Sequence, residues 1–203
     1  MTSSTPPDPR PASKDPDPRA LVARVIAGDA AAIERWFRGE HPVVWRLCLG
    51  FLAAPAEADD AAQDAMLHLL DRLPAWDSTR AFAPWRNSLV LNLCRDRARR
   101  QARRRRHEEF AATTRRERTL PDPADVLQER EVRAVLADTL AALPPREREA
   151  FVLRDLEGLA TEDVADAMEI TASSVRSLLT LARRRLRGLL GARLDPAQGV
   201  SDA

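Results

Sequence analysis

The residues best suited to chemistry in this chain are hydroxyl and arginine side chains in residues 157–186, EGLATEDVADAMEITASSVRSLLTLARRRL. The spacing predicts a short helix, a tight turn and a second helix that begins at Ala172 with Thr171 as its N-cap. Arginine bonds guanine bidentately, and hydroxyls bond bases or phosphates. We therefore predict a helix-turn-helix that reads DNA from the major groove. Its recognition face comprises Ser173, Ser174, Arg176, Ser177, Thr180, Arg183 and Arg184.

The same second helix carries an apolar stripe that would hold it on a core. The stripe recurs at steps of four, three and four residues, the period of a helix, and consists of Val175, Leu179, Ala182 and Leu186. Two local positions are unfavourable. Ala160 stands where a capping serine is expected, so Thr161 is the substitute cap, and a left-handed Glu169 in the turn would cost on the order of 1 kcal/mol. The alternative is an amphipathic hairpin whose polar stripe is only solvated.

A second set of candidates combines aromatic and cationic side chains. A proline-containing loop is bracketed by Trp76, Phe82 and Trp85, and the helix predicted to start at Trp85, with Pro84 at its first turn, ends in eight arginines between residues 95 and 106. Aromatic rings stack on unpaired bases, and cations follow phosphates. The predicted single-strand face comprises Trp76, Arg80, Phe82, Ser88, Asn92, Arg95 and Arg99.

Other interpretations of this segment remain open. The aromatic side chains could pack in a core, and the arginine run could be a solvated basic tail. Along the helix the inward stripe is predicted to be Trp85, Leu89 and Leu93.

An acidic strip on residues 57–73 is the third candidate surface. Its members lie at i, i+3, i+4 and i+7, which places them on one helix face opposite apolar residues. Carboxylates around one apolar side chain suit a protein partner, although such a strip is usually a solvated helix face. This docking face comprises Asp60, Gln63, Asp64 and Leu67.

Helices must position all three surfaces, and the periodicity predicts an all-α chain of two small helical domains joined by a flexible linker. Gly28 is the expected C-cap and Asp29 the expected N-cap of the first helix pair. The predicted divisions are a disordered tail at 1–18, a first domain at 19–106, a linker at 107–125, a second domain at 126–190 and a disordered tail at 191–203. The linker follows from Pro121-Asp122-Pro123, which cannot continue a helix.

The charge pattern, the cysteine spacing and the lengths of the apolar runs argue against a metal-binding, CxxC-type or membrane-inserted protein. The net charge of +1 hides a segregation of arginines and carboxylates that suggests two different partners. Cys48 and Cys94 show no metal-ligand or CxxC spacing, so buried free thiols in a cytoplasmic protein are expected. No apolar run approaches the roughly 20 residues that cross a bilayer, so no membrane insertion is expected.

These residues together resemble the extracytoplasmic-function (ECF) group of bacterial sigma factors over about residues 20–188. ADDAAQDAMLHLL resembles the family's polymerase-binding helix, and WDSTRAFAPWRNSLVLNLCRDRARR resembles its promoter-melting part. The segment from LPPRERE to LARRRL is similar to region four, which reads the minus-thirty-five element. Departures from the family pattern occur at Arg86, Leu91 and Leu181.

The resemblance implies a transcription initiation factor without catalytic, cofactor-binding or metal-binding residues. Its implied partners are core RNA polymerase, through the clamp region of the largest subunit, promoter DNA and an anti-sigma factor. Two rivals remain: a stand-alone helix-turn-helix repressor or activator, and an enzyme with a nucleic-acid-binding appendage. The enzyme would have to use His41, His68 or His107, which are scattered along the chain and accompanied by no nucleophile or paired carboxylate.

Overall fold

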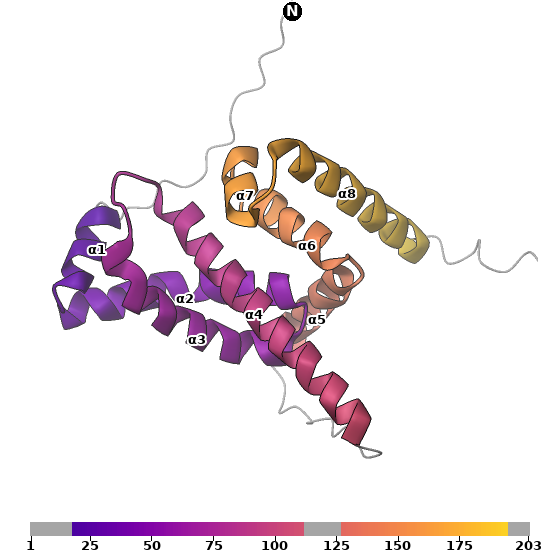
Figure 1. Ribbon diagram of the computed structural model, residues 1–203, viewed down its shortest axis with the longest axis horizontal. Coiled ribbons are helices and arrows are strands. Elements are labelled where there is room, and N and C mark those ends of the chain that lie inside the picture. Colours follow the sequence, from indigo (N-terminus) through magenta and orange to yellow (C-terminus); the bar gives the residue numbers. More distant parts are fainter. Residues whose placement is uncertain (1–17, 112–126, 195–203) are drawn as a thin grey trace, which may run out of the picture.

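The structure is a computed structural model that describes residues 18–111 and 127–194. In these residues every regular element is helical, which confirms the predicted all-α class (Figure 1). The N-terminal unit contains α1 (Pro18–Ile26), α2 (Ala30–Leu52), α3 (Pro55–Arg72), the short 3-10 helix η1 (Leu73–Ala75) and α4 (Phe82–Ala111). The C-terminal unit contains α5 (Leu127–Ala141), α6 (Pro145–Phe151), the π-helical turn η2 (Val152–Leu156), α7 (Thr161–Met168) and α8 (Ala172–Leu194).

The helices extend past two of the predicted boundaries. Helix α4 continues to Ala111, beyond the predicted linker start at 107, and α8 continues to Leu194, beyond the predicted tail start at 191. The remaining parts of the predicted tails and linker lie outside the described residues. No helix in the described ranges combines the length and the apolar character that a membrane crossing requires.

The first helix pair has the predicted caps. Gly28 has a φ of 81°, a left-handed conformation that glycine adopts at little cost. Asp29 caps α2 by accepting hydrogen bonds from the backbone amides of Ala31 and Ala32 at 3.0 and 3.1 Å. The Arg24 guanidinium and these amides lower the pKa of Asp29. These two residues therefore fix the sharp turn between α1 and α2.

Helix α4 differs from the prediction in start and in register. It begins at Phe82 rather than Trp85, so Pro84 lies inside its first turn. Trp85, Leu89 and Leu93 are only partly buried, whereas Val90, Leu91 and Cys94 are almost completely buried. The polar side chains of Arg86 and Asn87 are buried on the same side, where Arg86 donates to Glu40 at 2.9 Å and to Asn87 Oδ1 at 2.9 Å. The predicted inward stripe was therefore wrong by about one residue position around the helix.

The turn between α7 and α8 agrees with most of the prediction. Glu169 adopts a left-handed φ of 56°, and the Thr171 hydroxyl accepts a hydrogen bond from the Ser174 amide at 3.1 Å. The predicted cap at Thr161 is wrong, because Thr161 is already the first residue of α7 and Ala160 occupies the cap position without a side-chain bond. The predicted apolar stripe of α8 is buried throughout: Val175, Leu179, Ala182 and Leu186.

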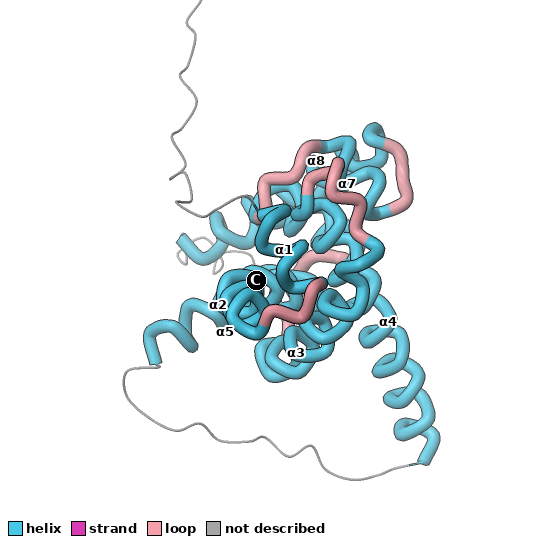
Figure 2. The backbone as a smooth tube through the Cα atoms, turned by 90° about the vertical axis from the view of Figure 1, so that its left-hand side faces the viewer, coloured by secondary structure: helices cyan, strands magenta, loops and turns pink. Residues whose placement is uncertain are grey.

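The two units pack against each other in one continuous core. Helix α7 lies on α4, and α6 and η2 lie on α2. In the side view of Figure 2, α7 and α8 lie above α2 and α3. At Gly50 the α2 backbone approaches so closely that an added Cβ would lie 3.0 Å from both methyl carbons of Val152. Helix α8 packs on α6 and α7 and lies on the far side of the C-terminal unit from α4. Helix α8 therefore keeps one face open to solvent, whereas α4 is packed against α2, α3 and α7.

Candidate nucleic-acid interface

The recognition face of α8 is open to solvent. All seven predicted residues, Ser173, Ser174, Arg176, Ser177, Thr180, Arg183 and Arg184, are exposed. The buried stripe on the opposite side fixes the helix orientation, so these side chains point away from the core. This face is therefore accessible without any rearrangement of its own unit.

The two principal arginines of this face differ in how firmly they are held. Arg176 is 65% exposed, and its guanidinium lies 3.9 Å from Glu162, a distance typical of a weak surface pair. Arg183 makes a two-pronged ion pair with Asp155 at 2.6 and 2.9 Å. The hydrogen bonds that Arg183 donates to the Asp155 carboxylate raise the pKa of Arg183. The Arg176 side chain is therefore less constrained than that of Arg183, which its own unit positions.

The aromatic residues of the single-strand face form one cluster at the start of α4. The Trp76 and Phe82 rings meet edge to face with centroids 5.2 Å apart, and Phe82 and Trp85 are 5.5 Å apart. Trp76 is only 9% exposed, and its indole N–H is buried without an acceptor. Arg80 beside it is 84% exposed on its side chain. The loop is shaped by Asp77, whose pKa is lowered by hydrogen bonds from the Thr79 hydroxyl and amide.

Farther along α4 the predicted polar strip is interrupted. Asn92 and Arg99 are exposed, and the Ser88 hydroxyl is partly buried and donates to the Pro84 carbonyl. Arg95, in contrast, is 17% exposed and is bound by Glu149 of α6 through two hydrogen bonds of 2.7 and 3.0 Å. Arg95 is therefore bound within the protein, and its contact with DNA stays a prediction. Sequence alone gave no signal for a partner 54 positions away.

The docking face of α3 is exposed in full. Asp60, Gln63 and Asp64 are exposed, and Leu67, the apolar member, is 63% exposed. Asp60 and Asp64 share Arg97 of α4 at 3.4 and 3.1 Å. Leu67 is thus an apolar side chain open to solvent on the same helix face as the carboxylates of Asp60 and Asp64.

The cysteines and histidines form no chemical site in the described part of the chain. Cys48 and Cys94 are buried as predicted, with their sulfurs 3.9 Å apart, a proximity the sequence did not reveal. In the described residues, no group of three or more His, Cys, Asp or Glu side chains is placed so that it could bind a metal ion. His41 and His68 lie on different helices, and the His107 side chain lies outside the described side chains.

Comparison with known proteins gives one consistent family. Residues 36–104 match the model for sigma-70 region 2, and residues 133–186 match the model for sigma-70, region 4. The chain is 32% identical over 171 residues to the ECF RNA polymerase sigma factor SigM of Mycobacterium tuberculosis, covering 84% of this chain and 83% of that protein. It is 30% identical over 175 residues to SigD of Mycobacterium bovis, covering 83% of this chain and 81% of that protein.

Solved structures show the same fold. CnrH, in complex with the cytosolic domain of CnrY, superimposes with a TM-score of 0.62 at 24% identity and covers 86% of this chain and 97% of that one. RpoE of Bartonella quintana, in complex with the anti-sigma factor NepR, superimposes with a TM-score of 0.61 at 17% identity and covers 78% of this chain and 96% of that one.

Proposed function

Since this chain belongs to the ECF group of RNA polymerase sigma factors, we propose that it binds core RNA polymerase, directs it to particular promoters and assists promoter melting. The docking face of α3 binds the clamp region of the polymerase, and the recognition face of α8 binds the upstream promoter element as duplex. The single-strand face of α4 and its loop binds unpaired bases. The chain acts as a binding protein and not as an enzyme, in the cytoplasm.

One observation carries this division of labour. The docking face and the recognition face are both exposed, and they lie on helices of different units. One chain therefore offers carboxylates around a leucine to a protein and hydroxyls and arginines to DNA. The aromatic cluster lies beside Arg80. Its rings can stack on unpaired bases, whereas the bases of a duplex do not need such partners.

Promoter melting requires no hydrolysis by this chain in the proposal. Unstacking a base costs a few kcal/mol, and its capture beside aromatic rings offsets that cost. Capture thus shifts the duplex towards its open form.

The test is binding of core polymerase by docking-face variants. Leu67→Glu and Asp60→Arg should each abolish capture of purified core polymerase, because one places a charge at an apolar contact and the other reverses a charge. Glu34→Arg is the matched control, since Glu34 is exposed on α2 outside the docking face. Equal polymerase binding by all variants would show that the docking face of α3 is only a solvated helix face.

The structures of relatives also motivate a regulatory partner. CnrH and RpoE were solved with partner proteins, one of them an anti-sigma factor. We propose that an anti-sigma factor likewise binds this chain and blocks polymerase binding. Co-expression with such an anti-sigma factor should reduce the capture of this chain by core polymerase, in proportion to the fraction of the chain that carries the bound anti-sigma factor.

A further inference from the structure

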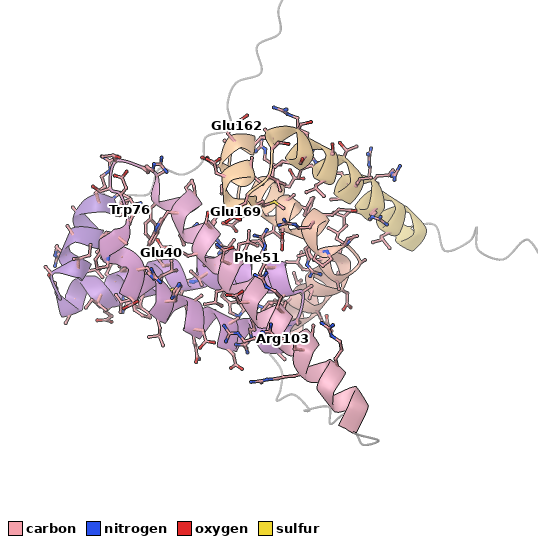
Figure 3. All side chains as sticks on the ribbon, viewed as in Figure 1. Glu40, Phe51, Trp76, Arg103, Glu162 and Glu169 are labelled. Atoms are coloured by element: carbon pink, nitrogen blue, oxygen red, sulfur yellow. The ribbon has the colours of Figure 1, made fainter. Side chains whose placement is uncertain are left out.

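A cleft between the two units is lined by four arginines. It has a volume of about 650 Å³ and lies between α4 on one side and α6 and the end of α7 on the other. Small-molecule sites typically have about 300–1,000 Å³. In Figure 3 the cleft lies beside α4, where Phe51 and Glu169 are labelled. The arginines are Arg95 and Arg99 of α4 and Arg146 and Arg148 of α6.

Three of these arginines are held by carboxylates of the same cleft. Glu149 accepts two hydrogen bonds from Arg95, at 2.7 and 3.0 Å, and one from Arg146 at 3.3 Å. Arg99 donates to Asp96 at 2.9 Å. Glu149 thus carries one negative charge against the two guanidinium charges that it binds.

Arg148 lies in the same cleft without an ion pair to any of the described residues. Its guanidinium donates to the Leu140 carbonyl at 3.4 Å. Burial lowers the pKa of Arg148, and the Glu149 carboxylate opposes only part of that effect. Glu169, the third carboxylate of the cleft, is exposed, so four positive side chains face three negative ones. A bound anion would therefore offset an excess of positive charge.

The other parts of the cleft suit an organic group rather than a bare ion. Ala98 and Pro145 are exposed apolar residues on its walls, and the buried Phe51 also lines it. Asn92 is exposed there as well, and its amide offers a donor and an acceptor to the edge of a nucleobase. The cleft thus combines cations for phosphates with apolar surface and an amide for a base.

We propose that this cleft binds a nucleoside diphosphate or triphosphate. Arg146 and Arg148 bind its phosphates, because guanidinium groups form pairs of parallel hydrogen bonds with phosphate oxygens. The base lies against Ala98 and Pro145. Since the arginines of the cleft belong to both units, a bound nucleotide stabilises the contact between them. The proposal goes beyond the proposed function, because Arg146 and Arg148 belong to none of its three surfaces and binding requires neither polymerase nor DNA.

Isothermal titration calorimetry of the full-length chain tests the site. ADP or GDP should bind at one site per chain. Pyrophosphate and adenosine should each bind about tenfold more weakly or worse, because pyrophosphate lacks the base and adenosine lacks the phosphates.

A charge variant and its control locate the phosphates. Arg148→Met should weaken nucleotide binding about tenfold or more, because it removes a charge-assisted contact. It should still fold, since Arg148 has no ion pair within the described residues and methionine keeps a long side chain. Arg103→Ala is the matched control, because Arg103 is exposed towards the free end of α4 and outside the cleft. It should leave nucleotide binding unchanged.

A shape variant tests the cleft without any change of charge. Ala98→Trp should abolish nucleotide binding, because the indole fills the space that the nucleotide needs. Ala102→Trp places the same side chain at an exposed position of α4 outside the cleft, and it should have no effect. Thermal scans by circular dichroism show whether each variant is folded. The nucleotide should raise the melting temperature of the parent and of the two controls, but not that of Ala98→Trp.

Three results would overturn the proposal. The first is that neither nucleotide gives a binding isotherm or raises the melting temperature. The second is equal affinity in the parent, Arg148→Met and Ala98→Trp, because the nucleotide would then lie on another basic part of the chain. The third is pyrophosphate binding as tight as that of ADP and GDP, which would show that the cleft has no place for a base. None of these outcomes depends on whether the chain binds polymerase.

Discussion

At the scale of single residues, the backbone is strained where a residue other than glycine has a positive φ. Glu169 holds a left-handed φ of 56° in the turn between α7 and α8, where glycine would be relaxed. Its side chain is exposed and is not needed to form the turn, because the backbone amide of Ile170 bonds the Ala165 carbonyl at 3.0 Å. The sequence pattern predicted this conformation from the helix-turn-helix spacing alone.

Replacing Glu169 tests the strain directly. Glu169→Gly should relieve up to about 1 kcal/mol and raise the melting temperature by about 2–4 °C for a chain of this size. Glu169→Ala removes the same charge but keeps the Cβ, so it should give no such increase. A thermal scan by circular dichroism measures both, and equal melting temperatures for the two variants would contradict the account.

Arg176 and Arg183 should differ in what they contribute to DNA binding. Arg176→Ala should change the preferred bases of the upstream element, with a loss of about 1–3 kcal/mol at the affected position. Arg183→Ala should weaken binding to all sequences alike, because Asp155 holds that side chain. Selection from a promoter library by the polymerase complex measures both. A change of base preference in Arg183→Ala alone would mean that the contacts on α8 lie one turn farther along.

Side-chain partners are what sequence predicts least well. The Arg95 position and its charge were evident, but its burial depends on Glu149, which lies 54 residues away and in the other unit. The proximity of Cys48 and Cys94 likewise depends on how α2 crosses α4. Periodicity specifies the face of a helix and says nothing about which helix covers that face.

At the scale of elements, the caps at Gly28 and Asp29 and the register of α8 were predicted, whereas the cap at Thr161 and the register of α4 were not. Gly28 and Asp29 satisfy backbone groups locally, so their roles follow from residue type and position. The inward face of α4 was wrong because it was assigned from apolar residues alone. Arg86 and Asn87 are buried through bonds to each other and to Glu40, which a search for apolar spacing does not find.

The cap of α2 gives a prediction with a defined pH dependence. Asp29→Ala should lower the melting temperature by a few degrees, because two amides lose their acceptor. Folding lowers the pKa of Asp29, so its contribution is complete above the unfolded value of about 3.9 and is lost as the pH falls through the lower folded value. The difference in melting temperature between the variant and the parent should therefore shrink in strong acid. A difference that grows on acidification would contradict the cap.

The register of α4 can be tested by truncating its two leucines. Leu91 is fully buried and Leu89 only partly, so Leu91→Ala should cost about 2–5 kcal/mol of stability and Leu89→Ala clearly less. Urea unfolding of both variants measures the difference. The reverse order would restore the inward stripe that the sequence predicted.

At the scale of the whole molecule, the two-unit organisation was predictable and the contact between the units was not. The apolar periodicity stops and restarts around the proline-rich segment, which separates two helical groups. Their contact includes a close fit of shape at Gly50 and Val152 and the ion pair between Arg95 and Glu149, and neither leaves a periodic signal. The family resemblance gave the order of the functional surfaces. The structure added that Arg95 of the predicted single-strand face is bound by Glu149 of the other unit.

The most direct test of the account is run-off transcription from a library of duplex promoters with purified core polymerase, with and without this chain. The account predicts that the chain confers transcripts from a distinct subset of promoters, that Asp60→Arg abolishes them and that Arg176→Ala broadens the subset. A chain that left the transcripts of core polymerase unchanged, yet bound a specific duplex tightly without polymerase, would contradict the account and favour a stand-alone repressor or activator.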